Sequence, residues 1–196
     1  MLHAIPEHIS NRMQYLEEID ARDRVNCTSR WERLRQIPSE TGKFIAFQAT
    51  LAPPGDIIEI GTSGGYSSLW LSLAANEKKC KIITFEILED KAKLARETFK
   101  QARVEDIITL IEDDALKHIE KYTNIAFCFI DAEKEIYSEC YDLVIPNLLT
   151  GGILIADNVI SHKKELRSMV DRVLHDKRVD ALTIPIGKGL LLCRKL

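Results

Sequence analysis

The sequence predicts an α/β fold in which helices cover both faces of a mostly parallel sheet. Short apolar runs rich in β-branched residues recur along the chain, between longer segments with a helical spacing of apolar residues. Strands that are apolar on both faces are typical of a parallel sheet covered on each side. The alternation predicts right-handed βαβ units, and a short glycine-bearing link near the end predicts a closing antiparallel hairpin.

The elements can be assigned in chain order. The parallel strands are expected at 56–60, 81–86, 107–112, 125–131 and 152–157. The helices between them are expected at 66–76, 88–102, 115–122 and 136–148. A helix around 162–175 then precedes two last strands, 181–186 and 190–195, which Gly187-Lys188-Gly189 joins. So short a link makes these strands antiparallel neighbours, which gives a sheet of seven strands.

The segment before the first strand is expected to be helical. Ile9, Met13, Leu16 and Ile19 mark an amphipathic helix. A second helix is expected at Ser39–Leu51, with Ser39 as its N-cap. No internal repeat or linker is evident, so we expect a single domain over 1–196, with a helical cover at 1–38 and the core at 39–196.

The stretch Arg30–Arg35 contains Trp31 and allows two interpretations. We expect Trp31 to lie in the core on a helix face. The alternative is a lid that holds Trp31 against a flat ligand.

Composition and charge limit the class of protein. The 196 residues carry 27 basic and 30 acidic side chains, a net charge of −3, so no nucleic-acid partner is expected. The 5 cysteines are scattered and partly embedded in apolar runs, which is typical of reduced cysteines in a cytosolic protein. The start lacks a basic region followed by an apolar stretch, and no long apolar run follows. We therefore expect a cytoplasmic protein with no membrane partner.

The stretch IEIGTSGGYSS, residues 58–68, predicts a ligand-binding corner between the first strand and the next helix. Glycines at 61, 64 and 65 let backbone N–H groups approach a ligand closely. Ser63 breaks the dinucleotide fingerprint G-x-G-x-x-G, which disfavours a pyrophosphate. Glu59 favours a cationic group such as an amine or a sulfonium instead.

Acidic residues follow the next two strands. Glu86 is placed to accept hydrogen bonds from both hydroxyls of a ribose, and Asp113-Asp114 is placed to meet an adenine edge. An adenosine with a cationic amino-acid tail fits all three positions, which predicts S-adenosylmethionine. The alternative is that Glu86 and Asp114 only cap the helices that follow them.

Polar side chains also end the fourth and fifth predicted strands. Asp131 ends the fourth, and Asp157-Asn158 ends the fifth. Ligands of open α/β sheets bind beyond the carboxyl ends of the strands, so these side chains should face one crevice. Two carboxylates and an amide oxygen suit Mg²⁺, Ca²⁺ or Mn²⁺ rather than zinc. The alternative is that Asp157 caps the next helix and Asn158 makes a turn.

Several segments, in this order, resemble the cation-dependent O-methyltransferases of the catechol and caffeoyl-CoA type. They are EIGTSGGYS, the acid at Glu86, DDA at 113–115, DAEK at 131–134 with Tyr137, GGILIADNV and IPIGKGLLL. The resemblance covers about residues 39–196 and implies a Rossmann-like class I methyltransferase fold. It implies the metal ligands Asp131, Asp157 and Asn158, with Lys134 as general base beside Asp131. It also implies a cofactor site formed by Glu59, Gly61, Gly65, Ser67, Glu86, Asp114, Ala115 and Asp131.

The chemistry of methyl transfer gives Lys134 a role. A free phenol has a pKa of about 10 and is mostly protonated at neutral pH, so it needs a metal ion and a base to become a nucleophile. A lysine close to a metal ion has a lowered pKa and can accept the proton. The alternative is a surface lysine paired with Glu133 or Glu135.

The acceptor is the least determined part of this hypothesis. Ile160–Lys164 stands where the family carries a tryptophan and a glycine, and Gly187-Lys188-Gly189 stands where many relatives have G-D-G. We expect a small phenolic or catecholic acceptor and a homodimer. The alternatives are a hydroxylated tRNA base as acceptor, a nicotinamide-dependent oxidoreductase and a binding protein without activity.

Overall fold

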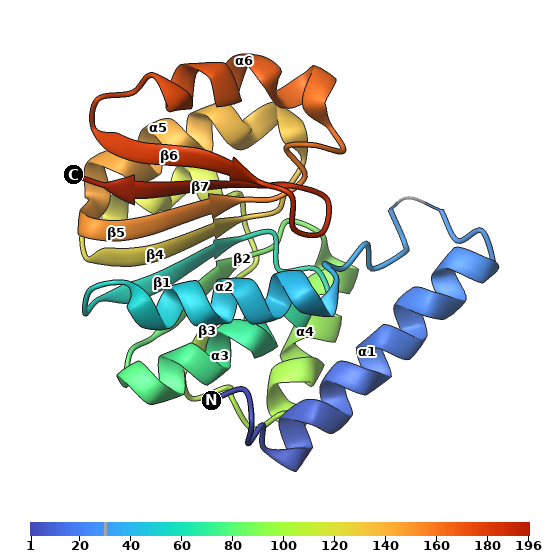
Figure 1. Ribbon diagram of the computed structural model, residues 1–196. Coiled ribbons are helices and arrows are strands. Elements are labelled where there is room, and N and C mark those ends of the chain that lie inside the picture. The colour runs from blue at the N-terminus through green and yellow to red at the C-terminus, as the bar shows by residue number, and fades with distance from the viewer. Residues whose placement is uncertain (30) are drawn as a thin grey trace.

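The fold centres on a seven-stranded sheet with the order β3-β2-β1-β4-β5-β7-β6. The computed structural model describes residues 1–29 and 31–196. The strands are β1 (Asp56–Ile60), β2 (Ile82–Phe85), β3 (Ile108–Ile111), β4 (Ile125–Ile130), β5 (Leu148–Ala156), β6 (Val179–Ile184) and β7 (Leu190–Lys195). β1 to β5 pair in parallel, and β7 is antiparallel to both β5 and β6 (Figure 1). The predicted fold class is confirmed.

Helices flank both faces of the sheet (Figure 1). They are α1 (Glu7–Val25), α2 (Ser39–Leu51), α3 (Tyr66–Lys78), α4 (Glu89–Gln101), α5 (Tyr137–Asn147) and α6 (Lys163–Leu174). Single turns of 3₁₀-helix lie at η1 (Ala115–Lys117), η2 (Ile119–Lys121) and η3 (Lys134–Ile136).

Three local predictions need correction. The α-helix expected at 115–122 is a pair of 3₁₀ turns, because Lys117 and His118 donate to carbonyls three residues back rather than four. β6 ends at Ile184 because Pro185 follows it, and Pro185 has no N–H for the ladder. Ser39 is not the N-cap of α2, since Pro38 precedes the helix and no side chain caps it.

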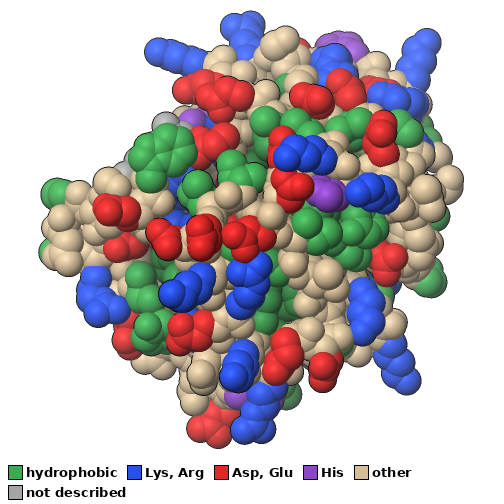
Figure 2. Space-filling view, turned by 180° about the vertical axis from the view of Figure 1, so that it is seen from behind, with side chains coloured by type: hydrophobic (Ala, Val, Ile, Leu, Met, Phe, Trp, Pro, Cys, Tyr) green, Lys and Arg blue, Asp and Glu red, His purple; other side chains and the backbone are tan. Residues whose placement is uncertain are grey.

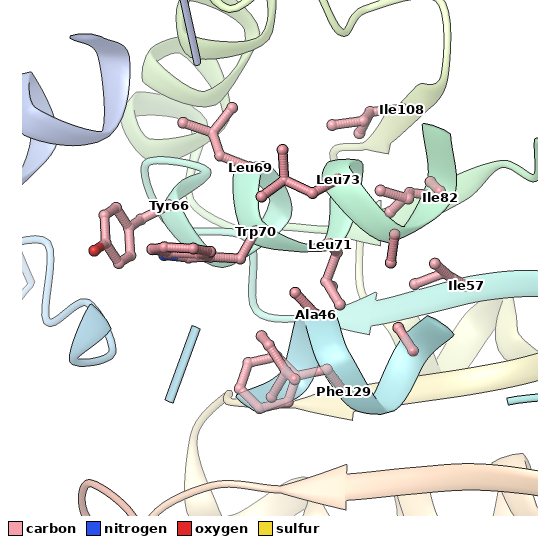
Figure 3. Packing of buried hydrophobic residues seen from close by; sticks show 14 of the residues in the cluster. Ala46, Ile57, Tyr66, Leu69, Trp70, Leu71, Leu73, Ile82, Ile108 and Phe129 are labelled. Atoms are coloured by element: carbon pink, nitrogen blue, oxygen red, sulfur yellow. The ribbon is translucent and has the colours of Figure 1, made fainter. Parts of the chain in front are cut away.

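The alternation of side chains along the strands divides the core in two. Ile57 and Phe127 point toward the face covered by α1 to α4, whereas Ile58 and Cys128 point toward α5 and α6. Figure 3 shows the first of these cores, where Leu71 of α3 lies near Ala46 of α2 and near Ile57 of β1. Because apolar side chains fill both faces of the sheet, the polar side chains at the strand ends are the groups of the sheet that can meet a polar ligand.

The N-terminal helix α1 lies against α3 and α4. Its residues Ile9, Met13 and Leu16 are buried, and Arg12 donates from Nε to Thr98 Oγ1 on α4 at 3.1 Å. The irregular segment 31–38 then leads to α2. Trp31 is 60% exposed, so the expectation of a core tryptophan is wrong; Arg30, the first residue of the stretch, lies outside the described residues.

The surface carries both signs of charge. Figure 2 shows lysine and arginine side chains mixed with aspartate and glutamate over one face of the molecule. Across residues 1–29 and 31–196, no helix is long and apolar enough to cross a membrane.

Candidate active site

A cavity of about 520 Å³ lies at the carboxyl ends of the parallel strands. Its walls come from the segment 31–37, the β1–α3 corner, the residues after β2 to β5, and the tip of the β6–β7 hairpin. This is the edge at which open α/β sheets bind ligands.

The β1–α3 corner is fixed from several directions. The N–H of Ser63 donates to Glu86 Oε2 at 2.7 Å, and Ser63 Oγ donates to the carbonyl of Leu34 at 2.8 Å. Gly61 has φ +101°, and a Cβ there would lie 2.2 Å from the carbonyl oxygen of Asp131. Only glycine permits this approach, so the end of β1 and the residue that follows β4 are held together.

Glu59 lies behind the cavity wall rather than on it. Its side chain is fully buried, and its Oε2 accepts hydrogen bonds from Thr84 Oγ1 at 2.6 Å and from Ser68. Burial raises the pKa of Glu59 to about 7, although the hydroxyls of Ser67, Ser68 and Thr84 act in the opposite direction. Oε1 is buried with no hydrogen-bond partner among the described residues.

Glu86 and Asp114 line the cavity and also support the backbone. Glu86 Oε1 accepts the N–H of Leu88 at 2.9 Å, and Asp114 Oδ1 accepts the N–H of Leu116 at 3.0 Å. Asp114 therefore caps the 3₁₀ turn η1, as the capping alternative expected, and it also lines the cavity. Capping does not exclude a ligand, because each carboxylate oxygen has a second lone pair.

Asp131, Asp157 and Asn158 come together after β4 and β5. Asn158 Nδ2 donates to Asp131 Oδ1 at 3.0 Å, and Asp157 Oδ1 accepts the N–H of Asn158 at 2.6 Å. Asp157 Oδ2 is buried and has no hydrogen-bond partner within the described part of the chain. Burial, reinforced by Asp131, raises the pKa of Asp157.

Lys134 lies beside this group. Its Nζ donates to the carbonyl of Ala132 at 2.7 Å and to Tyr137 Oη at 2.8 Å, and it is 3.5 Å from Asp131 Oδ1. Burial lowers the pKa of Lys134, while Asp131 acts in the opposite direction. The alternative of a surface lysine paired with Glu133 or Glu135 is not what the structure has.

The cavity thus brings together most of the expected site residues. Those that line it are Gly61, Ser67, Glu86, Asp114, Ala115, Asp131, Lys134 and Asn158. Glu59, Gly65 and Asp157 lie behind its wall. Gly65 packs against Phe99, where an added Cβ would lie 2.8 Å from the ring, so a side chain would not fit at this point of the corner.

Other lining residues were not assigned to the site from the sequence, apart from Trp31, which the lid alternative placed against a ligand. Trp31 and Arg35 come from the N-terminal segment, and Arg35 pairs with Glu133 at 2.7 Å. His162 and Lys188 come from the loop after β5 and from the final hairpin. The departures from the family pattern at 160–164 and 187–189 were the only sequence signal for the last two.

Comparison with known proteins identifies the family. A family model described as O-methyltransferase matches residues 7–196. A caffeoyl-CoA O-methyltransferase of Medicago sativa is 26% identical over 183 residues, which cover 81% of this chain and 74% of that protein. A catechol O-methyltransferase of Mycobacterium tuberculosis is 29% identical over 126 residues, which cover 63% of this chain and 57% of that protein.

Solved methyltransferase structures have a similar fold. A methyltransferase of Podospora anserina, PaMTH1, in a structure described as SAH-bound, superposes with a TM-score of 0.81 at 22% identity, over 98% of this chain and 89% of that chain. The family match excludes the nicotinamide-dependent oxidoreductase and confirms the family expected from the motifs. The chain therefore belongs to the O-methyltransferase family and is an S-adenosylmethionine-dependent O-methyltransferase.

Proposed function

We propose that this enzyme transfers the methyl group of S-adenosylmethionine to one of two vicinal hydroxyls of a small phenolic acceptor, with the help of a divalent cation. The observation that carries the proposal is the convergence of Asp131, Asp157 and Asn158 beside Lys134. We call the part of the cavity lined by Asp131, Lys134, Asn158, His162 and Lys188 the acceptor end. The part lined by Gly61, Ser67, Glu86, Asp114 and Ala115 is the cofactor end.

The residues at the acceptor end fit a divalent cation. Asp157 Oδ2 is buried and has no hydrogen-bond partner among the described residues. Burying such an oxygen costs free energy unless a hydrogen-bond donor or a cation binds it. Asp131 supplies a second carboxylate, and the Asn158 amide has an oxygen at its other end. We propose that these three residues hold Mg²⁺, with Ca²⁺ or Mn²⁺ as substitutes, because all three cations prefer oxygen ligands. When bound, the cation stabilises the acceptor as its oxyanion.

The cofactor end suits an adenosine with an amino-acid tail. We propose that Glu86 binds the ribose hydroxyls, that Asp114 and Ala115 contact the adenine, and that Gly61, Ser67 and Asp131 contact the methionine part. Glu59 and Gly65 support this end from behind, since neither lines the cavity. Position 63 is serine, whereas the dinucleotide-binding fingerprint has glycine there, so the sequence disfavours a dinucleotide at this end.

Lys134 is the proposed general base. Burial lowers its pKa, so Nζ loses its proton more easily than an exposed lysine does, and the carbonyl of Ala132 and Tyr137 Oη orient Nζ. The acceptor hydroxyl gives its proton to Lys134 Nζ, its oxygen bonds to the methyl carbon, and the bond from that carbon to sulfur breaks with its electron pair left on sulfur. Oxyanion and sulfonium neutralise each other as the bond forms, so a site that excludes water favours the transition state.

The test combines turnover with binding. Wild-type enzyme should methylate catechols in the presence of Mg²⁺ and lose this activity with a chelator. Asp157→Ala should abolish Mg²⁺-stimulated turnover while calorimetry detects nearly unchanged S-adenosylmethionine binding. Asp106→Ala, an exposed aspartate outside the cavity, is the matched control. Equal loss of turnover and cofactor binding in Asp157→Ala contradicts the metal assignment, and methylation of undermethylated tRNA instead of catechols contradicts the acceptor class.

Two further expectations stay predictions. A homodimer would have twice the 22.3 kDa mass of the chain in solution, which light scattering measures. A cytoplasmic location is tested by fractionating cells that produce the protein.

A further inference from the structure

Lys91 is a buried lysine in the cavity wall beside Glu86. It is the third residue of α4, the helix that follows β2, and it is only 8% exposed. Its Nζ donates a hydrogen bond to the carbonyl of Glu32 in the N-terminal segment. Burial lowers the pKa of Lys91, while the carboxylates of Asp23 and Glu86 act in the opposite direction. A buried ammonium costs free energy unless its hydrogen bonds are made, so the contact with Glu32 is hard to give up.

This contact belongs to a series that holds residues 32–35, which we call the strap, against the cavity. Leu34 is buried at its centre. The N–H of Leu34 donates to Asp23 Oδ2 of α1 at 3.0 Å, and the carbonyl of Leu34 accepts a hydrogen bond from Ser63 Oγ at 2.8 Å. The strap is therefore fixed both to the N-terminal helix and to the β1–α3 corner.

The strap crosses three neighbouring strand ends. Lys91 lies after β2, Ser63 after β1 and Glu133 after β4, and these strands stand in the order β2-β1-β4. Lys91 holds Glu32 at one end of the strap, and Glu133 pairs with Arg35 at the other at 2.7 Å. Most of the strap lines the cavity. A cofactor bound there is therefore enclosed between the strap and the strand ends.

The two ends of the strap are held unequally. The side chains of Arg35 and Glu133 are 37% and 27% exposed, and an ion pair that water reaches contributes little. The hydrogen bond from Lys91 is shielded from water and comes from a charged donor, which makes it the stronger of the two contacts.

We propose that Lys91 is a latch that keeps the strap closed over bound S-adenosylmethionine and thereby sets how fast the cofactor leaves. The inference concerns cofactor exchange rather than the acceptor, and it rests on the cofactor end proposed above. Lys91 is a positioning residue, because it acts on the cofactor through the strap. When the strap opens on this side, Lys91 gives up the carbonyl of Glu32.

The experiment measures cofactor release from the full-length protein by surface plasmon resonance. Lys91→Met keeps a long side chain but cannot donate a hydrogen bond. It should speed the dissociation of S-adenosylmethionine by about tenfold, the usual size of a hydrogen bond from a charged group, and raise KM for the cofactor. At saturating cofactor, kcat should not fall. Lys91→Arg can still donate and should release the cofactor at nearly the wild-type rate.

Trypsin gives a second measurement, because the strap contains Arg33 and Arg35. Bound S-adenosylmethionine should protect both cleavage sites in wild type, and the protection should be weaker in Lys91→Met. Lys93→Met is the matched control, since it removes an exposed lysine of the same helix outside the cavity. It should match wild type in cofactor release and in protection.

The outcomes separate the latch from folding and from the proposed function. Wild-type dissociation and protection in Lys91→Met overturn the inference, and so does a kcat that falls as far as cofactor affinity. If Lys91→Met does not fold, Lys91→Gln, whose amide is too short to reach as far, takes its place. Unchanged cofactor binding in Glu86→Ala would mean that the cofactor end itself is misplaced. Weakened binding in Glu86→Ala with wild-type release in Lys91→Met would remove the latch alone.

Discussion

The two ends of the cavity differ in how far the protein satisfies its own polar groups. At the cofactor end, Glu86 and Asp114 already accept backbone N–H groups, and Ser63 is bonded through both its N–H and its hydroxyl. At the acceptor end, Asp157 Oδ2 is buried and has no hydrogen-bond partner among the described residues. The cofactor end is thus preformed, whereas under the proposed function a bound cation would complete the acceptor end.

Gly61 joins the two ends. Its close contact with the carbonyl of Asp131 means that the corner and the residue after β4 cannot move independently. A cofactor that orders the corner would therefore also position the loop of Asp131 and Lys134.

The largest expected effect is a loss of kcat from a change at the acceptor end alone. Lys134→Met should lower kcat by about 100-fold or more, the usual contribution of a general base, with a small change in KM. Activity should recover as the pH rises toward the phenol pKa of about 10, because the acceptor then ionises without help. Steady-state rates between pH 7 and 10 measure this, and a rate equal to wild type at neutral pH would remove Lys134 as the base.

The next effect comes from disrupting the contact between Gly61 and the Asp131 carbonyl, which joins the two ends. Gly61→Ala adds a methyl group against the Asp131 carbonyl and strains a residue with φ +101°, so it should lower the free energy of unfolding by about 2 to 5 kcal/mol and weaken cofactor binding. Gly64→Ala is the matched control, because its Cβ would meet only leucine side chains at 3.2 to 3.4 Å. Urea unfolding and calorimetry measure both effects, and similar results for the two variants would contradict this view of Gly61.

A smaller effect concerns how stability depends on pH through Glu59, behind the cofactor end. Burial raises the pKa of Glu59 from 4.5 to about 7, so the folded state binds the proton more tightly than the unfolded state. The contribution of Glu59 to stability is therefore fully present below pH 4.5 and is lost as the pH rises through 7, by about 3 kcal/mol in total. Glu59→Gln cannot ionise and should gain stability relative to wild type over the same interval. A stability difference between the two proteins that is constant from pH 4.5 to 8 would contradict the buried carboxylate.

The smallest effect concerns the N-terminal wall. Arg35→Ala removes the ion pair with Glu133. The side chain of Arg35 is 37% exposed and that of Glu133 is 27% exposed, so the free energy of unfolding should change by less than about 1 kcal/mol. The acceptor KM should rise a few-fold because the segment 31–37 is held less firmly, while kcat changes little. Arg33→Ala, which removes an exposed arginine of the same wall, is the comparison. A large loss of kcat in Arg35→Ala would mean that Arg35 acts on the reaction directly.

The sequence predicted the fold and the carboxylates for reasons that are local. Strand patterns, helix patterns and the glycine-bearing hairpin each depend on a few neighbouring residues, and acids that end parallel strands must meet at one sheet edge. The 3₁₀ turns at 115–121 and the exposed Trp31 were mispredicted. Their apolar residues fit a helix or a core equally well, and tertiary contacts made the choice.

By itself, the sequence determined the seven-stranded sheet, its antiparallel end and the group of Asp131, Lys134, Asp157 and Asn158, since residue type and order along the strands fix all of these. Only the tertiary structure decided that Glu59 lies behind the wall, that Gly61 lies against the Asp131 backbone and that Lys188 lines the cavity. These features depend on contacts between residues far apart in the chain, and burial and the availability of partners follow from such contacts rather than from residue type.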